Sequence, residues 1–298
     1  MKTRFEIAAG RLLLPLLVAA AAACSREKPP GPTPGGETRI VSLSPALTDI
    51  VFDMGLGDLV VGVSRYCQLP PGQKRRVVGS MVDADTEMLL SVKPTHLLFQ
   101  GPADHFGNIV RLRPSIRLEG FRVETLDGIG EAVERIGRLA GRPALARKTL
   151  ASFTRKIEAS RKLTRGSRPV RVIFLMDSRR MGFMAAGPNN FIDDLIVLNS
   201  AVNLGRFLPG SGPWRKTELE TLLAAGPELI ICQVDPDEPE QMLRTRKKWS
   251  RYLGQPGMAL RRVEVVDDPR WTFPSTGLAD LAEEMALLIH PELKNGKP

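Results

Sequence analysis

Short apolar runs alternate along the chain with longer stretches in which apolar residues recur every three or four positions. The short runs predict buried strands, and the longer stretches predict amphipathic helices. In the first half this pattern predicts, in order, strand 39–44, helix 45–53, strand 59–63, helix 86–92, strand 96–100, strand 123–126 and helix 129–140. Strands that alternate with helices are typical of parallel α/β structure.

One long helix is predicted after this half, over residues 142–165. The stretch contains no glycine or proline after Pro143, and proline is tolerated in a first helical turn. An apolar stripe runs along it through Ala146, Leu150, Phe153 and Ile157. The α/β alternation then resumes as strand 171–176, helix 190–198, helix 218–225, strand 229–233, helix 239–252, strand 262–266 and helix 277–289.

The two halves share an internal repeat. The stretch from Glu87 to Gln100 and the stretch from Glu220 to Gln233 carry Glu, Leu, Leu, Pro and Gln at the same offsets. We therefore expect an α/β protein with two Rossmann-like lobes, over residues 39–141 and 166–292. A single long backbone helix over residues 142–165 would join them. In such a pair the ligand cleft lies between the lobes, where the carboxyl ends of the strands face each other.

The first residues are typical of a secretion signal, predicted here over residues 1–23. Three basic residues precede an apolar run of twelve residues, which is shorter than the ~20 that a membrane-spanning helix needs. Small residues before Cys24 are typical of a lipoprotein signal, in which the cysteine is acylated; simple cleavage after an A-x-A site is the alternative. Residues 24–38 are rich in Pro, Gly and charge and predict a flexible tether to the membrane.

The net charge of +9 raises the question of nucleic-acid binding. Basic residues are spread among interleaved acids and aromatic residues make up only 5% of the chain, so we expect a solvated basic surface, no nucleic-acid partner and a monomer.

Sequence motifs for catalysis are absent: the chain has no HExxH, GxSxG, GxxxxGK[ST] or CxxC. Four pairs of acids, Asp83/Asp85, Asp193/Asp194, Asp235/Asp237 and Asp267/Asp268, lie where turns and helix starts are predicted. There an aspartate caps backbone amides more often than it binds metal. We expect no enzyme, no catalytic residue, no bound metal and no cofactor; a metal-dependent hydrolase built on these pairs, or a structural lipoprotein without a ligand, are the competing classes.

Aromatic side chains near the predicted cleft are the candidate ligand contacts. Tyr66 follows a predicted strand end, Trp214 lies in a glycine-rich loop, and Trp271 and Phe273 lie in a further loop at the same end. A flat ligand would stack on such rings, and the alternative for Tyr66 and Trp214 is a rim or core aromatic. His105, in another loop, is a candidate axial ligand to a cobalt or iron centre or else an exposed loop histidine.

Glu87 and Glu220 occupy equivalent positions of the two repeats, each near a helix start. An acid there stabilises the helix dipole by ~0.3–1 kcal/mol, which explains either residue alone. Matched acids on both lobes could instead pair with one arginine on each subunit of a two-fold partner.

Three stretches carry a family resemblance: RIVSLSPALTDIVFDMGLGDLVVGVS (39–64), YCQLPP (66–71) and the repeat block 87–100. The chain resembles the periplasmic binding proteins with a rigid inter-lobe helix, which serve cobalamin, haem and ferric-siderophore importers, and most of all the cobalamin-binding members. This implies a lipid-anchored solute-binding protein, in the periplasm or on the outer side of the cell membrane. It would capture a cobalamin-type corrinoid, or alternatively haem or a ferric siderophore, for an ABC permease dimer with its ATPase.

The resemblance also implies roles for individual residues. Tyr66 and Trp214 match ligand-contacting aromatics, and Glu87 and Glu220 match glutamates that dock on the permease. The chain departs from the pattern at Met81, which stands where a further cleft tryptophan is usual and which we therefore also expect to contact the ligand. It departs again at residues 273–276, which replace a Ser/Gly-Pro-Arg motif.

Overall fold

The computed structural model of the protein describes residues 37–178, 181–235 and 238–295. The predicted signal, Cys24, most of the tether and Asp237 lie outside these residues. The described chain confirms the predicted fold class, because it contains two α/β sheets and one long helix packed against helices of both.

The first lobe is built on a five-stranded parallel sheet with the order β3-β2-β1-β4-β5. Its strands are β1 (Ile40–Ser42), β2 (Val60–Val63), β3 (Arg76–Val77), β4 (His96–Gln100) and β5 (Arg117–Phe121). The helices between and after them are α1 (Pro45–Asp53), α2 (Thr86–Ser91), α3 (Gly107–Leu112) and α4 (Leu126–Leu139). β1 is buried along its whole length, as the central strand of a sheet covered on both faces must be.

Local capping determines where these helices begin. Ser44 accepts a hydrogen bond from the Leu47 amide at the start of α1, and Pro45 occupies the first turn. Asp85 caps α2 through the Met88 amide. Thr125 caps α4 through the Gly128 amide at 3.1 Å. The strand predicted at residues 123–126 is therefore wrong: the fifth strand ends at Phe121 and Thr125 already starts a helix.

The second lobe contains a mixed sheet with the order β11-β10-β6-β7-β9, in which β8 pairs with the first part of β6. Its strands are β6 (Val170–Ser178), β7 (Gly182–Ala186), β8 (Ala201–Asn203), β9 (Trp214–Thr217), β10 (Leu229–Gln233) and β11 (Arg262–Val266). Its helices are α6 (Phe191–Leu198), α7 (Leu219–Ala224), α8 (Pro239–Ser250) and α9 (Leu278–Ile289). β7 runs antiparallel to both β6 and β9, an addition that the sequence pattern did not predict.

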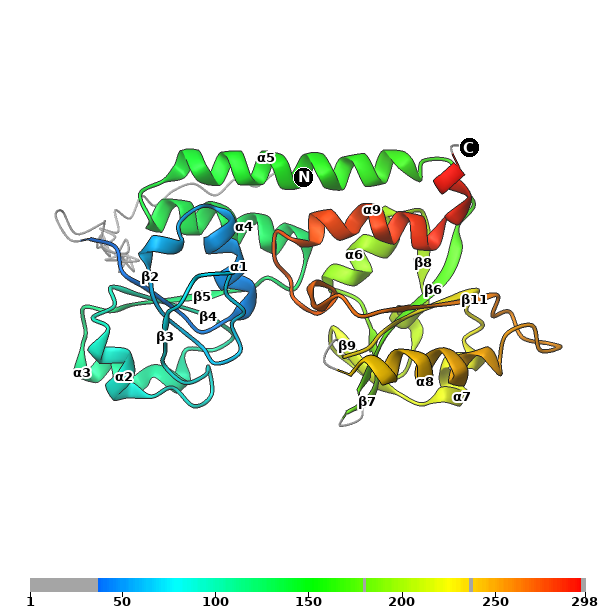
Figure 1. Ribbon diagram of the computed structural model, residues 1–298, viewed down its shortest axis with the longest axis horizontal. Helices are drawn as coiled ribbons and strands as arrows, with labels where there is room; N and C mark the ends of the chain where they lie inside the picture. The colour runs from blue at the N-terminus through cyan, green and yellow to red at the C-terminus, as the bar shows by residue number, and fades with distance from the viewer. Residues whose placement is uncertain (1–36, 179–180, 236–237, 296–298) are drawn as a thin grey trace, which may run out of the picture. The chain divides into compact units, whose positions relative to one another are not determined.

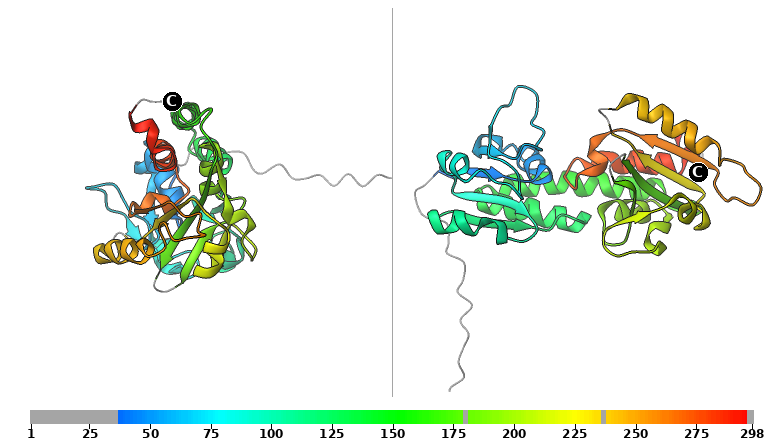
Figure 2. Two further views of the ribbon diagram at one scale, coloured as in Figure 1. Left: turned by 90° about the vertical axis from the view of Figure 1, so that its right-hand side faces the viewer. Right: turned by 90° about the horizontal axis from the view of Figure 1, so that it is seen from below.

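The long helix α5 (Pro143–Leu163) has 21 residues and so spans about 32 Å. It packs against α4 of the first lobe and α9 of the second, as Figure 1 shows. On the first lobe the approach is close: a Cβ added to Gly137 of α4 would lie 2.4 Å from the Ala146 Cβ. On the second lobe the Ser160 hydroxyl donates to the Ala282 carbonyl at 2.6 Å. Seen from below in the right view of Figure 2, the strands of the two lobes lie toward opposite ends of this helix.

Direct contacts between the lobes form a second connection, which we call the lobe seam. The Thr276 hydroxyl, just before α9, donates to the Asp53 carboxylate at the end of α1. The Leu126 amide at the start of α4 donates to Asp194 of α6 at 2.9 Å. Two separate hydrogen bonds and a docked helix restrict the relative motion of the lobes more than a loop connection would.

The repeat segments have the same local structure in both lobes. The first forms α2 and β4, and the second forms α7 and β10, with Pro94 and Pro227 in the connecting turns. The residue before each proline, Lys93 and Gly226, has a positive φ of 48° and 70°. The matched backbone supports the interpretation of the sequence similarity as a structural repeat.

Candidate ligand-binding site

A cavity of about 410 Å³ lies at the carboxyl ends of β6 and β10, and we call it the strand-end cavity. Its lining residues come from both lobes: Gln68, Met176, Asp177, Ser178, Met181, Gln233, Val234, Asp235, Glu238, Gln241, Pro269, Thr272 and Phe273. Open α/β sheets bind ligands outside the carboxyl ends of their strands, and the volume suits a small molecule. Gln68 follows β2 of the first lobe, so the cavity is bounded across the cleft.

The wall of this cavity combines an apolar part with hydrogen-bond acceptors. Met176, Met181 and Phe273 supply polarisable and aromatic surface. Asp177, Asp235 and Glu238 place carboxylates at the same site. An apolar wall with a few polar groups fits a small organic ligand, or the edge of a larger flat ligand whose remainder extends into the cleft between the lobes.

Two residues of α8 hold the acidic side of the cavity in place. The Gln241 side chain donates a hydrogen bond from Nε2 to the backbone carbonyl of Asp177 at 2.6 Å, and its Oε1 accepts one from the backbone N–H of Asp235 at 3.2 Å. These two bonds connect α8 to the ends of β6 and β10. The Lys248 ammonium lies 3.7 Å from the Asp177 carboxylate and 4.0 Å from the centre of the Phe183 ring. The cation is thus shared between a carboxylate and a ring on the β6–β7 side.

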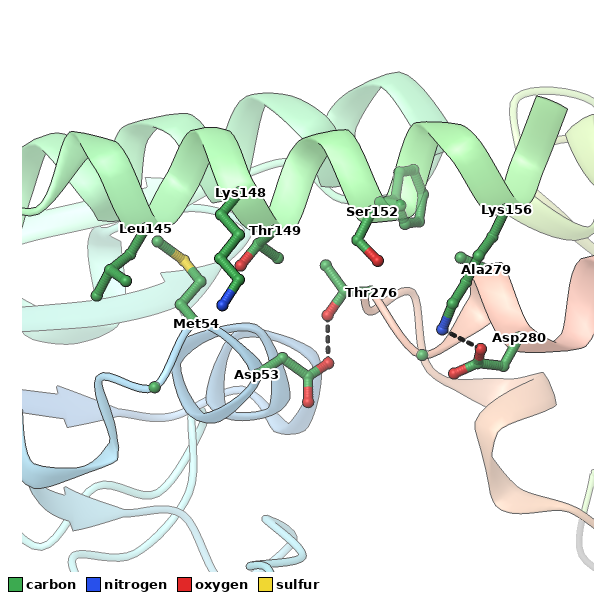
Figure 3. Close-up of a pocket in the computed structure, with 13 residues that line it drawn as sticks. Asp53, Met54, Leu145, Lys148, Thr149, Ser152, Lys156, Thr276, Ala279 and Asp280 are labelled. Carbon is green, nitrogen blue, oxygen red and sulfur yellow. Dashed lines mark hydrogen bonds and ion pairs between the residues drawn. The ribbon is translucent and has the colours of Figure 1, made fainter. Parts of the chain in front are cut away.

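A second hollow of about 490 Å³ lies beneath α5 at the lobe seam (Figure 3). Asp53 reaches it from α1, Lys148 and Lys156 from α5, and Asp280 from α9. Lys156 forms an ion pair with Asp280, and Asp53 accepts from Thr276, so most of its charged groups are used in joining helices. It is not at the carboxyl ends of the strands, and we interpret it as part of the seam and not as the ligand site.

Next to this hollow, Asp49 of α1 is an unusual carboxyl group. Burial, and secondarily the negative charge of Asp53 one turn later, raises its pKa from 3.8 to about 6, although the Ser275 side chain lowers it. The Asp194 carboxyl in the seam also has a raised pKa, chiefly because it is buried. Proton binding is therefore linked to the contacts between the lobes.

Of the six predicted ligand contacts, Phe273 lines the strand-end cavity, and the other five are not among its described lining residues. Tyr66 is 64% exposed at the end of β2, where it would be accessible to a ligand. His105 is exposed in a short 3₁₀ helix (Asp104–Phe106), and Met81 is half-buried against the core of the first lobe. These placements leave the roles of Tyr66, Met81 and His105 as predictions.

The two tryptophans differ from the expectation. Trp271 has no exposed surface and its ring centre lies 6.0 Å from that of Phe174, so it is a core residue of the second lobe and presents no face to a ligand. Trp214 lies in β9 and not in a loop, half-buried, with ring centres 6.3 Å from those of Phe174 and Phe191. The unpredicted β7–β9 pairing draws Trp214 against the core.

Sequence reasoning missed most of the residues that do line the cavity. Met176 and Met181 lie in no motif, and Gln68 lies in the YCQLPP stretch (66–71) of the family resemblance, which assigned a role only to Tyr66. Gln233 did carry a signal, because it ends the second repeat at the carboxyl end of a strand, where ligands of this architecture bind.

Glu87 and Glu220 lie in the first turns of α2 and α7, and both are exposed. Within the part of the chain that the structure describes, neither has a hydrogen-bond or ion-pair partner. Figure 1 shows α2 and α7 on the side of each lobe away from α5. Both acids are thus available to an external partner on that side.

The paired aspartates mostly have structural roles. Asp85 caps α2, Asp268 accepts the Arg270 amide at 2.9 Å, and Asp193 accepts from the Arg206 guanidinium at 2.6 and 2.9 Å. Among the described residues, no group of three or more His, Cys, Asp or Glu side chains is placed to hold a metal ion. None of the helices formed by these residues has both the length and the apolar character that crossing a membrane requires.

Comparison with known proteins agrees with this architecture. Residues 40–251 match the periplasmic binding protein family, and the chain belongs to that family. It is 27% identical over 199 residues to a vitamin B12-binding protein of Vibrio cholerae serotype O1, covering 65% of this chain and 69% of the relative.

Solved structures show the same fold. The periplasmic vitamin B12-binding protein BtuF of Vibrio cholerae superposes with a TM-score of 0.70 at 20% identity, covering 86% of this chain and 97% of that one. The periplasmic heme-binding protein RhuT from Roseiflexus sp. RS-1 superposes with a TM-score of 0.69 at 21% identity, covering 87% of this chain and all of that one. The likeness to structures with different ligands shows the fold and does not distinguish between the ligands.

Proposed function

We propose that this periplasmic binding protein captures a corrinoid of the cobalamin type between its lobes and delivers it to an ABC importer. The observation that carries the proposal is the strand-end cavity, which lies where this architecture binds ligands and is bounded by Gln68 from one lobe and Phe273 from the other. The relative with 27% identity, named as a vitamin B12-binding protein, supports the choice of ligand within the family.

Each part of the cavity has a task in this proposal. Met176, Met181 and Phe273 cover an apolar face of the macrocycle, and the polar residues around them meet its substituted edge. Tyr66, exposed at the end of β2, supplies a further ring from the first lobe. Trp214 contributes through the part of its ring that the core does not cover.

Delivery involves a different surface. Glu87 and Glu220 would each contact an arginine on one subunit of a permease dimer, and their exposure on α2 and α7 supports this role. We also propose that acylated Cys24 anchors the protein to the outer side of a membrane, with residues 25–38 as the tether.

Calorimetric titration of the mature protein with cobalamin, cobinamide, haemin and a ferric siderophore tests the ligand assignment. We expect binding of the two corrinoids and at least tenfold weaker binding of the others. Clear binding of haemin or the siderophore with no heat from either corrinoid would show that only the family assignment holds.

A matched pair of variants locates the site. Phe273→Ala removes an aromatic wall of the cavity and should weaken corrinoid binding about 5- to 10-fold. Phe52→Ala removes an equally half-buried ring that packs under Arg75, away from the cavity, and should leave affinity unchanged. Equal effects of the two changes would place the corrinoid elsewhere.

A further inference from the structure

The repeat places a glutamine at the carboxyl end of an inner strand in each lobe, Gln100 on β4 and Gln233 on β10. The two side chains differ in one respect. The Oε1 of Gln100 accepts a hydrogen bond from the Ser44 hydroxyl. The Oε1 of Gln233 is buried and has no hydrogen-bond donor among the described residues.

The orientation of the Gln233 amide is determined by its other end. Its Nε2 donates to the Val234 carbonyl at 2.8 Å, and an exchange of the amide oxygen and nitrogen would set two acceptors against each other. Oε1 is therefore the atom left without a partner. The residue is 4% exposed and lines the strand-end cavity. A buried acceptor without a donor destabilises the protein, because the acceptor has lost its hydrogen bonds to water. A ligand group that donates a hydrogen bond to Oε1 would remove this destabilisation.

The surroundings of Gln233 select the type of ligand group. Asp177, Asp235 and Glu238 line the same cavity, and none of the described lining residues is Lys, Arg or His. Two cations beside the cavity already face its carboxylates: the Lys248 ammonium lies 3.7 Å from Asp177, and the Arg244 guanidinium lies 3.7 Å from Glu238. A carboxylate on the ligand has no hydrogen to donate to the buried Gln233 Oε1, whereas an N–H group would satisfy that acceptor.

We propose that the strand-end cavity recognises a primary carboxamide on the edge of the ligand, with its N–H donating to the Gln233 Oε1, and that a ligand with a carboxylate at that edge binds less tightly because its oxygen would face Oε1 without a hydrogen between them. The proposal rests on corrinoid binding as the function. It makes Gln233 a specificity-determining residue, which distinguishes amidated corrinoids from unamidated ones and from the propionate edge of haem.

Two corrinoids with the same ring and metal provide the test. Cobinamide carries carboxamides around the corrin, and cobyrinic acid carries carboxylic acids at the same positions. Both would be titrated in the dicyano form at neutral pH and in moderate salt, which screens long-range attraction between the basic protein and the acid. We expect the wild-type protein to bind cobinamide at least 20-fold more tightly.

Variants then assign the preference to residues. Gln233→Leu should weaken cobinamide binding about 5- to 20-fold, because the ligand amide loses its acceptor in a buried site, and should leave cobyrinic acid binding unchanged. The matched control is Gln100→Leu, at the equivalent position of the repeat, which should leave both affinities within twofold.

Gln233→Glu covers the case in which Gln233→Leu does not fold. It keeps the size of the side chain and an acceptor for the ligand N–H, while its second oxygen replaces the Nε2 donor that faces the Val234 carbonyl. The added negative charge should widen the preference for cobinamide over cobyrinic acid relative to the wild-type protein.

The outcomes separate this inference from the function on which it rests. Binding of neither corrinoid overturns both. Binding of cobyrinic acid as tightly as cobinamide, or equal losses of both ligands in Gln233→Leu, overturns the role of Gln233 while corrinoid binding stands.

Discussion

Asp49 lies on α1 next to the lobe seam, and its replacement by Asn tests whether a buried carboxyl group there makes stability depend on pH. The change keeps the size of the side chain and its capacity to hydrogen-bond with Ser275. It removes the partly buried negative charge and the repulsion with Asp53, which are the two causes of the raised pKa. The effect should therefore be electrostatic and should depend on pH in a defined direction.

The sign follows from the two pKa values. In the unfolded chain the Asp49 carboxyl ionises near 3.8, but in the folded protein it keeps its proton up to about pH 6. Stability from this group is fully present below pH 3.8 and is lost as the pH rises through about 6. The pKa difference corresponds to about 3 kcal/mol as an upper limit. Because the side chain is only half-buried, solvent screening should leave about 1–2 kcal/mol.

Urea unfolding followed by circular dichroism at pH 4 and pH 7.5 measures this effect. We expect Asp49→Asn to have a free energy of unfolding close to that of the wild-type protein at pH 4 and about 1–2 kcal/mol higher at pH 7.5. Glu131→Gln, which removes an exposed acid from α4, is the control and should show no such dependence. A stability difference that is the same at both pH values, or a less stable variant at pH 7.5, would refute the electrostatic reasoning.

Three further predictions concern docking, helix packing and anchoring. Changing Glu87 and Glu220 together to Ala should reduce transport in a reconstituted importer more than either change alone, because each exposed ion pair with the permease contributes ~0.2–1 kcal/mol. Ligand affinity should stay the same. A loss of transport that follows a loss of ligand affinity would show that the two residues are ordinary acids at helix starts. Gly137→Ala should lower the free energy of unfolding by about 1–3 kcal/mol because its methyl group would overlap that of Ala146, and an unchanged thermal midpoint would contradict the close packing of α4 on α5. Cys24→Ala should abolish incorporation of labelled fatty acid and release the protein from the membrane fraction; continued labelling would place the anchor elsewhere.

The sequence alone determined the elements whose signals are local. The stripe through Ala146, Phe153 and Ile157 has helical spacing, and α5 begins and ends within two residues of the predicted bounds. The same holds for strand β10, a short apolar run between turn residues. Such patterns reflect burial of one face by the nearest neighbours in the chain, so they can be read without knowledge of the tertiary structure. The repeat, and with it the two-lobed fold class, follows from the same local signals.

Tertiary structure decided what depends on distant partners. β7 and β9 form because they pair with β6 and with each other, and that pairing, not the local sequence around Trp214, sets its ring against Phe174 and Phe191. The sequence predicts Trp271 as a cleft residue, but in the folded protein its ring packs against Phe174 and is completely buried. Gln100 and Gln233 are equivalent in sequence, yet only Gln100 has Ser44 within reach, because hydrogen bonding of a side chain is settled by the residues that other strands bring to it. Composition and periodicity indicate which residues are buried. Only the folded chain determines which of their polar atoms lack a hydrogen-bond partner and can therefore bind a ligand.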